Sequence, residues 1–177
     1  SLVIAREYEN GTMETIRALP VRAGEFFLGK AIPYFFITLV DVLVAILMGQ
    51  VLFGVVMKSS VWLMIVASII YIVVGLAIGL LISIKTKSQL VANQLAVLVT
   101  YLPSLLLSDF VFPQQNMPAA LKAVSKLVPA TYYIDILNGL YLRDLSFLQL
   151  WPSFLVLVAM AALLSALNIR ALKKEGL

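Results

Sequence analysis

Long apolar runs separated by short polar segments make up most of the chain after Lys30. Four of these runs are long enough to cross a bilayer as helices: residues 31–57, 61–84, 90–112 and 151–169. A spanning helix needs about 20 mostly apolar residues. Only a few polar residues separate the first three runs, so those helices must be antiparallel neighbours. The pattern predicts an all-α membrane protein with four transmembrane helices, in a transmembrane domain over residues 31–177.

The segment before these runs, residues 1–30, mixes charged and apolar positions instead. Asn10-Gly11 is a turn signal, after which Thr12 can cap a short helix that ends at Pro20. A second helix restarts near Ala23 and leads into the membrane. The short helix is amphipathic, which suits either a lipid surface or a partner protein. Surface helices usually carry a basic polar face, so the acids in this one favour a protein partner.

A weaker apolar segment lies between the third and fourth runs, at about residues 119–142. It contains Pro129 and Asp135 and is too short and too polar to span the membrane comfortably. Two predictions stay open: a re-entrant segment buried in protein, or an amphipathic helix on the outer surface. Asn138-Gly139 would suit a turn within it.

Lysine and arginine fall unevenly on the two sides of the predicted membrane. With a cytoplasmic N-terminus, nine lie inside: Arg6, Arg17, Arg22, Lys30, Lys85, Lys87, Arg170, Lys173 and Lys174. Four lie outside: Lys58, Lys122, Lys126 and Arg143. Cytoplasmic segments carry the excess of basic residues, so both termini of the chain are predicted to be cytoplasmic.

Composition narrows the function classes further. The chain is 62% hydrophobic and 12% charged, and it has neither histidine nor cysteine. These absences remove the commonest zinc ligand, the commonest neutral-pH base and any disulfide. No paired acids, nucleophile–base pair, metal cluster or basic aromatic patch stands out, so we expect no catalysis, no metal, no cofactor and no nucleic acid.

One apparent nucleotide motif is rejected. "GEFFLGKA" matches the phosphate-loop pattern except that Ala31 replaces the hydroxyl residue that holds magnesium. No strand precedes it, and Lys30 leads directly into a membrane span. We therefore interpret it as a helix entering the bilayer, with the lysine at the headgroups.

Several polar and small residues lie inside the predicted spans. Gly75, Gly79 and Ser83 are four apart and share a face, which predicts a groove for a neighbouring helix backbone. Asp41 is costly at its depth, by about 2.5–3.5 kcal/mol, so it should face protein or water. It either lines a substrate path or proton relay, or pairs with a neighbour such as Thr38 or Asn93. The uncharged polar residues of the spans are more often used for interhelical hydrogen bonds than for a binding site: Thr38, Gln50, Asn93, Gln94, Thr100 and Asn168.

Three stretches of the chain resemble type-2 ABC transporter permeases, the membrane subunits of bacterial ATP-driven exporters. These stretches, which follow the order found in that family, are "AREYENGTMETIRALPVRAGEFFLGKAIPY", "LPSLLLSDFVFPQQNMP" and "LVPATYYIDILNGLYLRD". Asp109 is one departure, since the family more often has a small residue such as glycine there.

The resemblance implies a role for the amphipathic segment: a coupling helix seated in a groove of a separate ATPase. Residues carried over to that contact are Arg6, Glu7, Glu9, Gly11, Thr12 and Glu14. The resemblance also implies that the four spans are the last four of six and that the residue 119–142 segment is re-entrant on the outer side. The chain would then be the C-terminal portion of a longer permease or a short relative.

The sequence thus predicts a permease subunit of an ABC exporter in the bacterial inner membrane, paired with a second permease copy or subunit. ATP and Mg²⁺ would bind only to the partner ATPase. Thr38, Asp41, Asn93 and Thr100 are predicted to line the path. The alternative is an ATP-independent carrier or membrane scaffold in which Asp41 is a proton or ion site.

Overall fold

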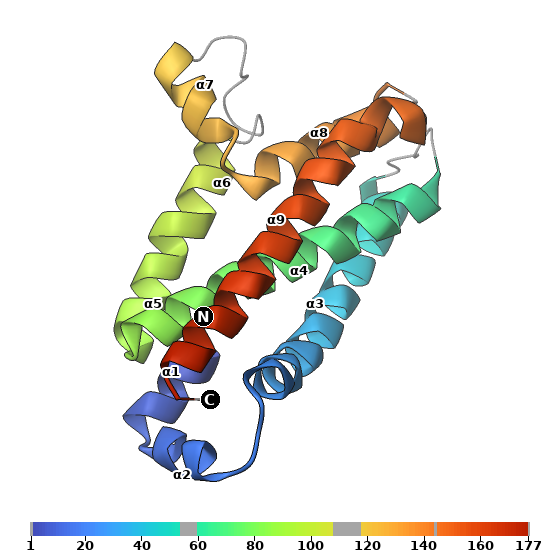
Figure 1. The fold of residues 1–177 in the computed structure, drawn as a ribbon. Coiled ribbons are helices and arrows are strands. Elements are labelled where there is room, and N and C mark those ends of the chain that lie inside the picture. Colours follow the sequence, from blue (N-terminus) through green and yellow to red (C-terminus); the bar gives the residue numbers. More distant parts are fainter. Residues whose placement is uncertain (1, 54–59, 108–117, 144, 177) are drawn as a thin grey trace.

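The computed structural model describes residues 2–53, 60–107, 118–143 and 145–176. All regular elements within those ranges are helices, arranged as an elongated bundle (Figure 1). In the same ranges, four helical stretches are long and apolar enough to cross a membrane: Ala23–Leu52, Val61–Thr86, Gln89–Leu107 and Phe147–Lys174. The predicted all-α class with four membrane-crossing helices is therefore confirmed.

The first two long helices extend beyond the apolar runs that predicted them. α3 (Ala23–Phe53) begins before residue 31 because the carboxylate of Glu25 accepts the backbone N–H of Arg22 at 3.0 Å, at the helix start. The rejected phosphate-loop pattern lies inside this helix. α4 (Val61–Thr86) ends at Lys87, which adopts a left-handed conformation with φ 55° and donates its N–H to the Ser83 carbonyl.

The third span is a helix with an irregular middle. It consists of α5 (Gln89–Ala96), a π-helical turn η1 (Val97–Tyr101) and α6 (Leu102–Leu107). In η1, the N–H of Leu102 bonds the Val97 carbonyl, five residues back. Pro103 follows directly and has no N–H to donate. Single π turns inside α-helices are uncommon and occur frequently at functional sites.

The last span, α9 (Phe147–Lys174), packs along α4 and also contacts α3 and α8 (Figure 1). Its start is fixed by a capping box, in which Ser146 and Gln149 each bond the other's backbone N–H. The buried Asn168 side chain joins it to α4 by donating to the Ala77 carbonyl at 2.8 Å.

Two short helices precede α9 at the end of the bundle opposite the termini: α7 (Ala119–Ser125) and α8 (Pro129–Tyr141) (Figure 1). The turn expected at Asn138-Gly139 is wrong, because α8 continues through both residues. Gly139 is buried there, and a Cβ would approach Leu150 Cδ2 to 2.7 Å. The glycine therefore permits close packing against α9, and the chain turns only after Tyr141.

Two apolar clusters hold the helices together. The terminal core joins α1–α4 and α9 at the end that carries both termini: Ile4, Met13, Ala23, Phe26, Phe27, Leu80, Ile84, Ala171 and Leu172. A second cluster joins α4, α8 and α9: Met64, Ala67, Ile136, Leu140, Leu150, Phe154 and Leu157. Outside these clusters many large apolar side chains are exposed, such as Leu148 at 81% and Val51 at 79%. Such exposure suits contact with lipid, since large apolar patches are rare on soluble proteins.

Candidate partner-binding site

Two short helices, α1 (Leu2–Glu9) and α2 (Thr12–Ala18), lie at the end of the bundle where the α4–α5 turn and the C-terminus also meet (Figure 1). The turn between them depends on Gly11, whose φ of 71° is readily adopted only by glycine. This confirms the turn expected at Asn10-Gly11. The N-cap of α2 is Gly11 and not Thr12, whose hydroxyl instead donates to the Glu7 carbonyl at 3.2 Å and to the Glu7 carboxylate.

The α1 backbone lies directly against α4. The Ser83 hydroxyl oxygen accepts the backbone N–H groups of Ile4 at 3.0 Å and Ala5 at 2.6 Å, and both residues are fully buried. Beside Gly75, in contrast, a Cβ would meet nothing within 4 Å. The packing role of Gly75 and Gly79 stays a prediction.

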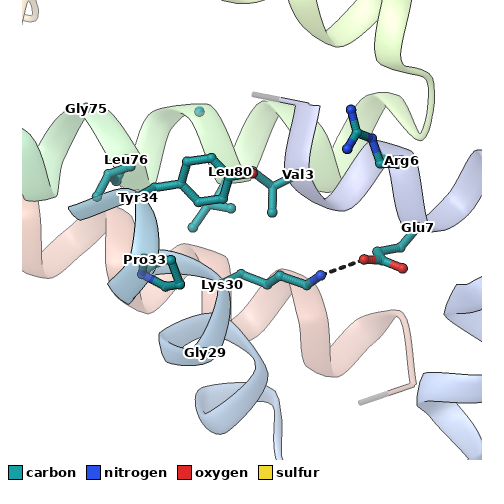
Figure 2. A pocket seen from close by; sticks show the side chains of 12 residues that line it. Val3, Arg6, Glu7, Gly29, Lys30, Pro33, Tyr34, Gly75, Leu76 and Leu80 are labelled. Atoms are coloured by element: carbon teal, nitrogen blue, oxygen red, sulfur yellow. Dashed lines mark hydrogen bonds and ion pairs between the residues drawn. The ribbon is translucent and has the colours of Figure 1, made fainter. Parts of the chain in front are cut away.

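Glu7 connects α1 to the start of the first span. Its carboxylate pairs with the Lys30 ammonium at 2.5 Å, and both residues line a cavity of about 590 Å³ between α1, α3 and α4 (Figure 2). Gly75 and Gly79 line the same cavity. The hydrogen bond from Lys30, and then that from Thr12, lowers the pKa of Glu7 below its ordinary value. The Glu7 carboxylate is therefore already paired with residues of this chain.

Arg6 and Glu9 connect α1 to the start of α5. One Glu9 carboxylate oxygen accepts the backbone N–H of Gln89 at 2.7 Å, and the other accepts the Gln89 side-chain amide at 2.6 Å. The Arg6 guanidinium donates to the Gln89 side-chain oxygen at 3.5 Å. The backbone hydrogen bond from Gln89 is the main cause that lowers the pKa of Glu9. This carboxylate lies at a helix N-terminus, where negative charge is favourable.

Glu175, just beyond α9, gathers side chains from three other parts of the chain. Its Oε2 accepts Lys87 Nζ at 2.7 Å, the Tyr8 hydroxyl at 3.0 Å and Arg17 Nη2 at 3.1 Å. The hydrogen bond from Lys87 is the largest cause that lowers the pKa of Glu175. Burial, followed by the bond to Glu175, raises the pKa of Tyr8. We call these four residues the Glu175 cluster.

The face of α2 that points away from the bundle is exposed. Met13 is 2% exposed and belongs to the terminal core, whereas its neighbours Glu14 and Thr15 are exposed. Among the described residues, the Glu14 carboxylate has no hydrogen-bond or ion-pair partner. Of the acids predicted to contact a partner, Glu14 is therefore accessible, whereas Glu7 and Glu9 are engaged within the chain.

The predicted path residues are divided between α3 and the third span, which lie on opposite sides of α4 and α9 (Figure 1). The Thr38 hydroxyl donates to the Tyr34 carbonyl at 2.8 Å, and that of Thr100 donates to the Ala96 carbonyl. Asp41 and Asn93 are exposed and make no hydrogen bond within the described part of the chain. Their role in a path stays a prediction, and Asp109 lies outside the described residues.

Sequence reasoning did not identify the Glu175 cluster. In the sequence, Arg17 and Lys87 indicated only which side of the membrane their segments face, and no pattern distinguished Glu175. The available signal was the predicted topology itself, which puts the N-terminal segment, the residue 85–89 turn and the C-terminus on one side. A lone acid among basic residues at such a convergence is a candidate for ion pairing.

Comparisons with known proteins agree on one family. The sequence model described as "ABC-2 family transporter protein" matches residues 1–170. The chain is 35% identical over 168 residues to "Probable multidrug ABC transporter permease YbhS" of Escherichia coli, covering 95% of this chain and 45% of that protein. It is 30% identical over 162 residues to "Probable multidrug ABC transporter permease YbhR" of the same organism, covering 92% of this chain and 44% of that protein.

A eukaryotic relative, "ABC transporter G family member 20" of Dictyostelium discoideum, is 24% identical over 177 residues, which are 99% of this chain and 24% of that protein. The chain thus spans less than half the length of each of these relatives.

Proposed function

Because the chain belongs to the ABC-2 family of transporter proteins, we propose that it is a permease subunit driven by a separate ABC ATPase that binds α2. The observation that carries this proposal is the way α2 is exposed on one face and packed against the bundle on the other. An exposed face with an unpaired acid, Glu14, is joined through buried contacts to α3, α4 and α9. A load applied to that face is transmitted to three spans.

The mechanism follows from differential binding. ATP binding closes the ATPase dimer, whose grooves then hold α2 in one of two positions, and the spans adopt the arrangement that fits. A partner can shift a two-state equilibrium only by its difference in affinity for the two states. Converting a 1:99 population into 99:1 requires about 5.5 kcal/mol. The ATPase must therefore bind the two positions of α2 with affinities that differ by an energy of about that size.

The resemblance to bacterial exporters supports transport outward across the inner membrane, by a pair of permease subunits. The curated relatives YbhS and YbhR carry the word "multidrug" in their names, which supports small amphipathic molecules as the first substrates to test. The basic residues at the α1–α2 end support a cytoplasmic location for it.

The experiment measures binding of the detergent-solubilised permease to a separately purified candidate ABC ATPase. Reversing the charge of an exposed, unpaired acid tests the contact without breaking a bond within the chain. We expect Glu14→Arg to weaken ATPase binding about tenfold, equivalent to about 1.4 kcal/mol. The control is Ala120→Arg on α7, which places the same side chain at an exposed position at the other end of the bundle and should leave binding unchanged.

Glu7→Arg and Glu9→Arg are poorer probes, because each also breaks contacts to Lys30 or Gln89 within the chain. Wild-type affinity in Glu14→Arg, together with wild-type affinity in Thr15→Arg, would overturn the assignment of α2 as the gripped element.

A further inference from the structure

We propose that Glu175 is a positioning residue that locks the α1–α2 unit to the end of α9 and to the α4–α5 turn, so that movement of α2 is passed to these spans. This inference rests on the proposed function. It adds a residue beyond the gripped helix itself, one that contacts neither ATP nor any substrate.

The geometry of the Glu175 cluster connects four elements at one atom. Oε2 accepts donors from α1 (Tyr8), α2 (Arg17) and the turn after α4 (Lys87), at 3.0, 3.1 and 2.7 Å. Glu175 itself is fixed to the last turn of α9, because its backbone N–H bonds the carbonyls of Ala171 at 3.2 Å and Leu172 at 3.0 Å. The carboxylate therefore moves with α9.

The donors also contact one another through the Tyr8 ring. Lys87 Nζ lies 5.0 Å and Arg17 Cζ 5.8 Å from the ring centroid, distances at which a cation is attracted to an aromatic face. Lys87 holds a left-handed backbone with φ 55°, which is uncommon for a residue other than glycine. The side chain of Lys87 contacts both Glu175 and the Tyr8 ring.

The position of Arg17 makes the cluster part of the coupling route. It lies three residues after Glu14 on α2, so the two side chains are about one helical turn apart. A force on Glu14 therefore loads the Arg17–Glu175 pair almost directly. Apart from the bonds of the Thr12 hydroxyl to Glu7 on α1, the other side-chain contacts that join α2 to the rest of the described chain are apolar ones of Met13 and Ile16, which permit sliding more readily than directional bonds.

Burial distinguishes this role from a simple stabilising one. The paired side chains are partly exposed, at 35% for Arg17, 47% for Lys87 and 25% for Glu175. Exposed ion pairs contribute little to stability. Removing the Glu175 charge should therefore leave the fold intact while it loosens the geometry between α2 and α9.

The test uses the permease in complex with its ATPase, reconstituted in liposomes. The chain has no cysteine, so introduced cysteines are the only labelling sites within it. Spin labels at Ala18→Cys and Lys174→Cys report the α2–α9 distance. Separately, maleimide labelling of Leu98→Cys reports rearrangement of the third span when ATP is added, without any need to know the substrate.

We expect Glu175→Gln to broaden the α2–α9 distance distribution and to reduce the ATP-driven change in Leu98→Cys labelling at least threefold. ATPase binding should stay within twofold of wild type. The matched control is Glu25→Gln, which loses an acid at the same end of the bundle but outside the cluster. Lys87→Gln should reproduce the Glu175→Gln effect, and the double variant should be no worse than either single variant.

A narrow wild-type distance and a full ATP response in Glu175→Gln would overturn the inference, as would additive effects of Glu175→Gln and Lys87→Gln. These results are distinct from failure of the proposed function. That failure would appear as unchanged ATPase binding in both Glu14→Arg and Thr15→Arg, or as no ATP response in the wild type.

Discussion

Two glycines inside helices have opposite surroundings, which shows that residue type alone does not determine a role. Gly139 on α8 is buried, and an added Cβ would contact both Leu150 and Leu145. Gly49 on α3 has nothing within 4 Å of the same position. Asn138-Gly139 favours a turn in sequence, but the close approach of α9 makes it a packing position. Only the tertiary structure distinguishes these two uses of glycine.

This difference predicts stability changes of opposite sign. Gly49→Ala should stabilise the protein by up to about 1 kcal/mol, through helix propensity alone. Gly139→Ala gains the same term but overpacks a tight contact, which costs about 1–3 kcal/mol, so we expect net destabilisation. Thermal unfolding in detergent measures both variants. An increase in Tm for Gly139→Ala comparable to that for Gly49→Ala would contradict the packing interpretation.

At the scale of elements, α8 is tied to its neighbours by the hydroxyl groups of the "PATYY" stretch. Pro129 begins the helix, where its missing N–H is not needed. The Thr131 and Tyr132 hydroxyls donate to the carbonyls of Ser125 and Lys126, at 2.9 and 2.8 Å. Tyr133 stacks on Tyr71 of α4, with ring centroids 4.4 Å apart. The sequence predicted a short polar-interrupted segment here, but its contact with Tyr71 depends on a distant helix that only folding brings close.

The Tyr133 contact gives a prediction about the α8–α4 junction. Its hydroxyl lies 2.9 Å from Ser68 Oγ, and Ser68 already donates to the Met64 carbonyl, so Tyr133 is the donor. Tyr133→Phe should cost about 0.5–1.5 kcal/mol, whereas Tyr133→Ala should cost about 3–5 kcal/mol because it also leaves a cavity.

Thermal unfolding of Tyr133→Phe, Ser68→Ala and the double variant measures the coupling between the two hydroxyl groups. The control is Tyr132→Phe, whose hydroxyl bonds only a backbone carbonyl within the described chain. Equal losses in Tyr133→Phe and Tyr133→Ala would show that stacking on Tyr71 contributes nothing.

At the scale of the whole molecule, segments distant in sequence meet at one end of the bundle. Tyr8, Lys87 and Glu175 are in contact there, while α7 lies at the other end (Figure 1). The uneven distribution of lysine and arginine predicts the same grouping, because it places the N-terminal segment, residues 85–89 and the C-terminus on one side. Which side of the membrane this end faces is a prediction from charge.

The orientation is testable with single cysteines, since the chain has none of its own. We expect an impermeant maleimide to label Ala120→Cys on α7 in intact cells. Thr15→Cys on α2 should react only after the membrane is permeabilised, because the positive-inside rule places that end in the cytoplasm. Labelling of Thr15→Cys in intact cells would show that the topology is the opposite of the predicted one. It would also remove the basis for an ATPase partner at α2.

The sequence by itself determined the class of the protein, the four spanning helices and the charged N-terminal segment. These features depend on the length of apolar runs and on local turn chemistry, which act over a few consecutive residues. The tertiary structure decided which acids are accessible and which are engaged. Glu7, Glu9 and Glu14 look alike in sequence, but the first two meet Lys30 and Gln89 once the helices pack, and Glu14 does not. Partners of that kind are set by the relative positions of distant helices, which no local pattern records.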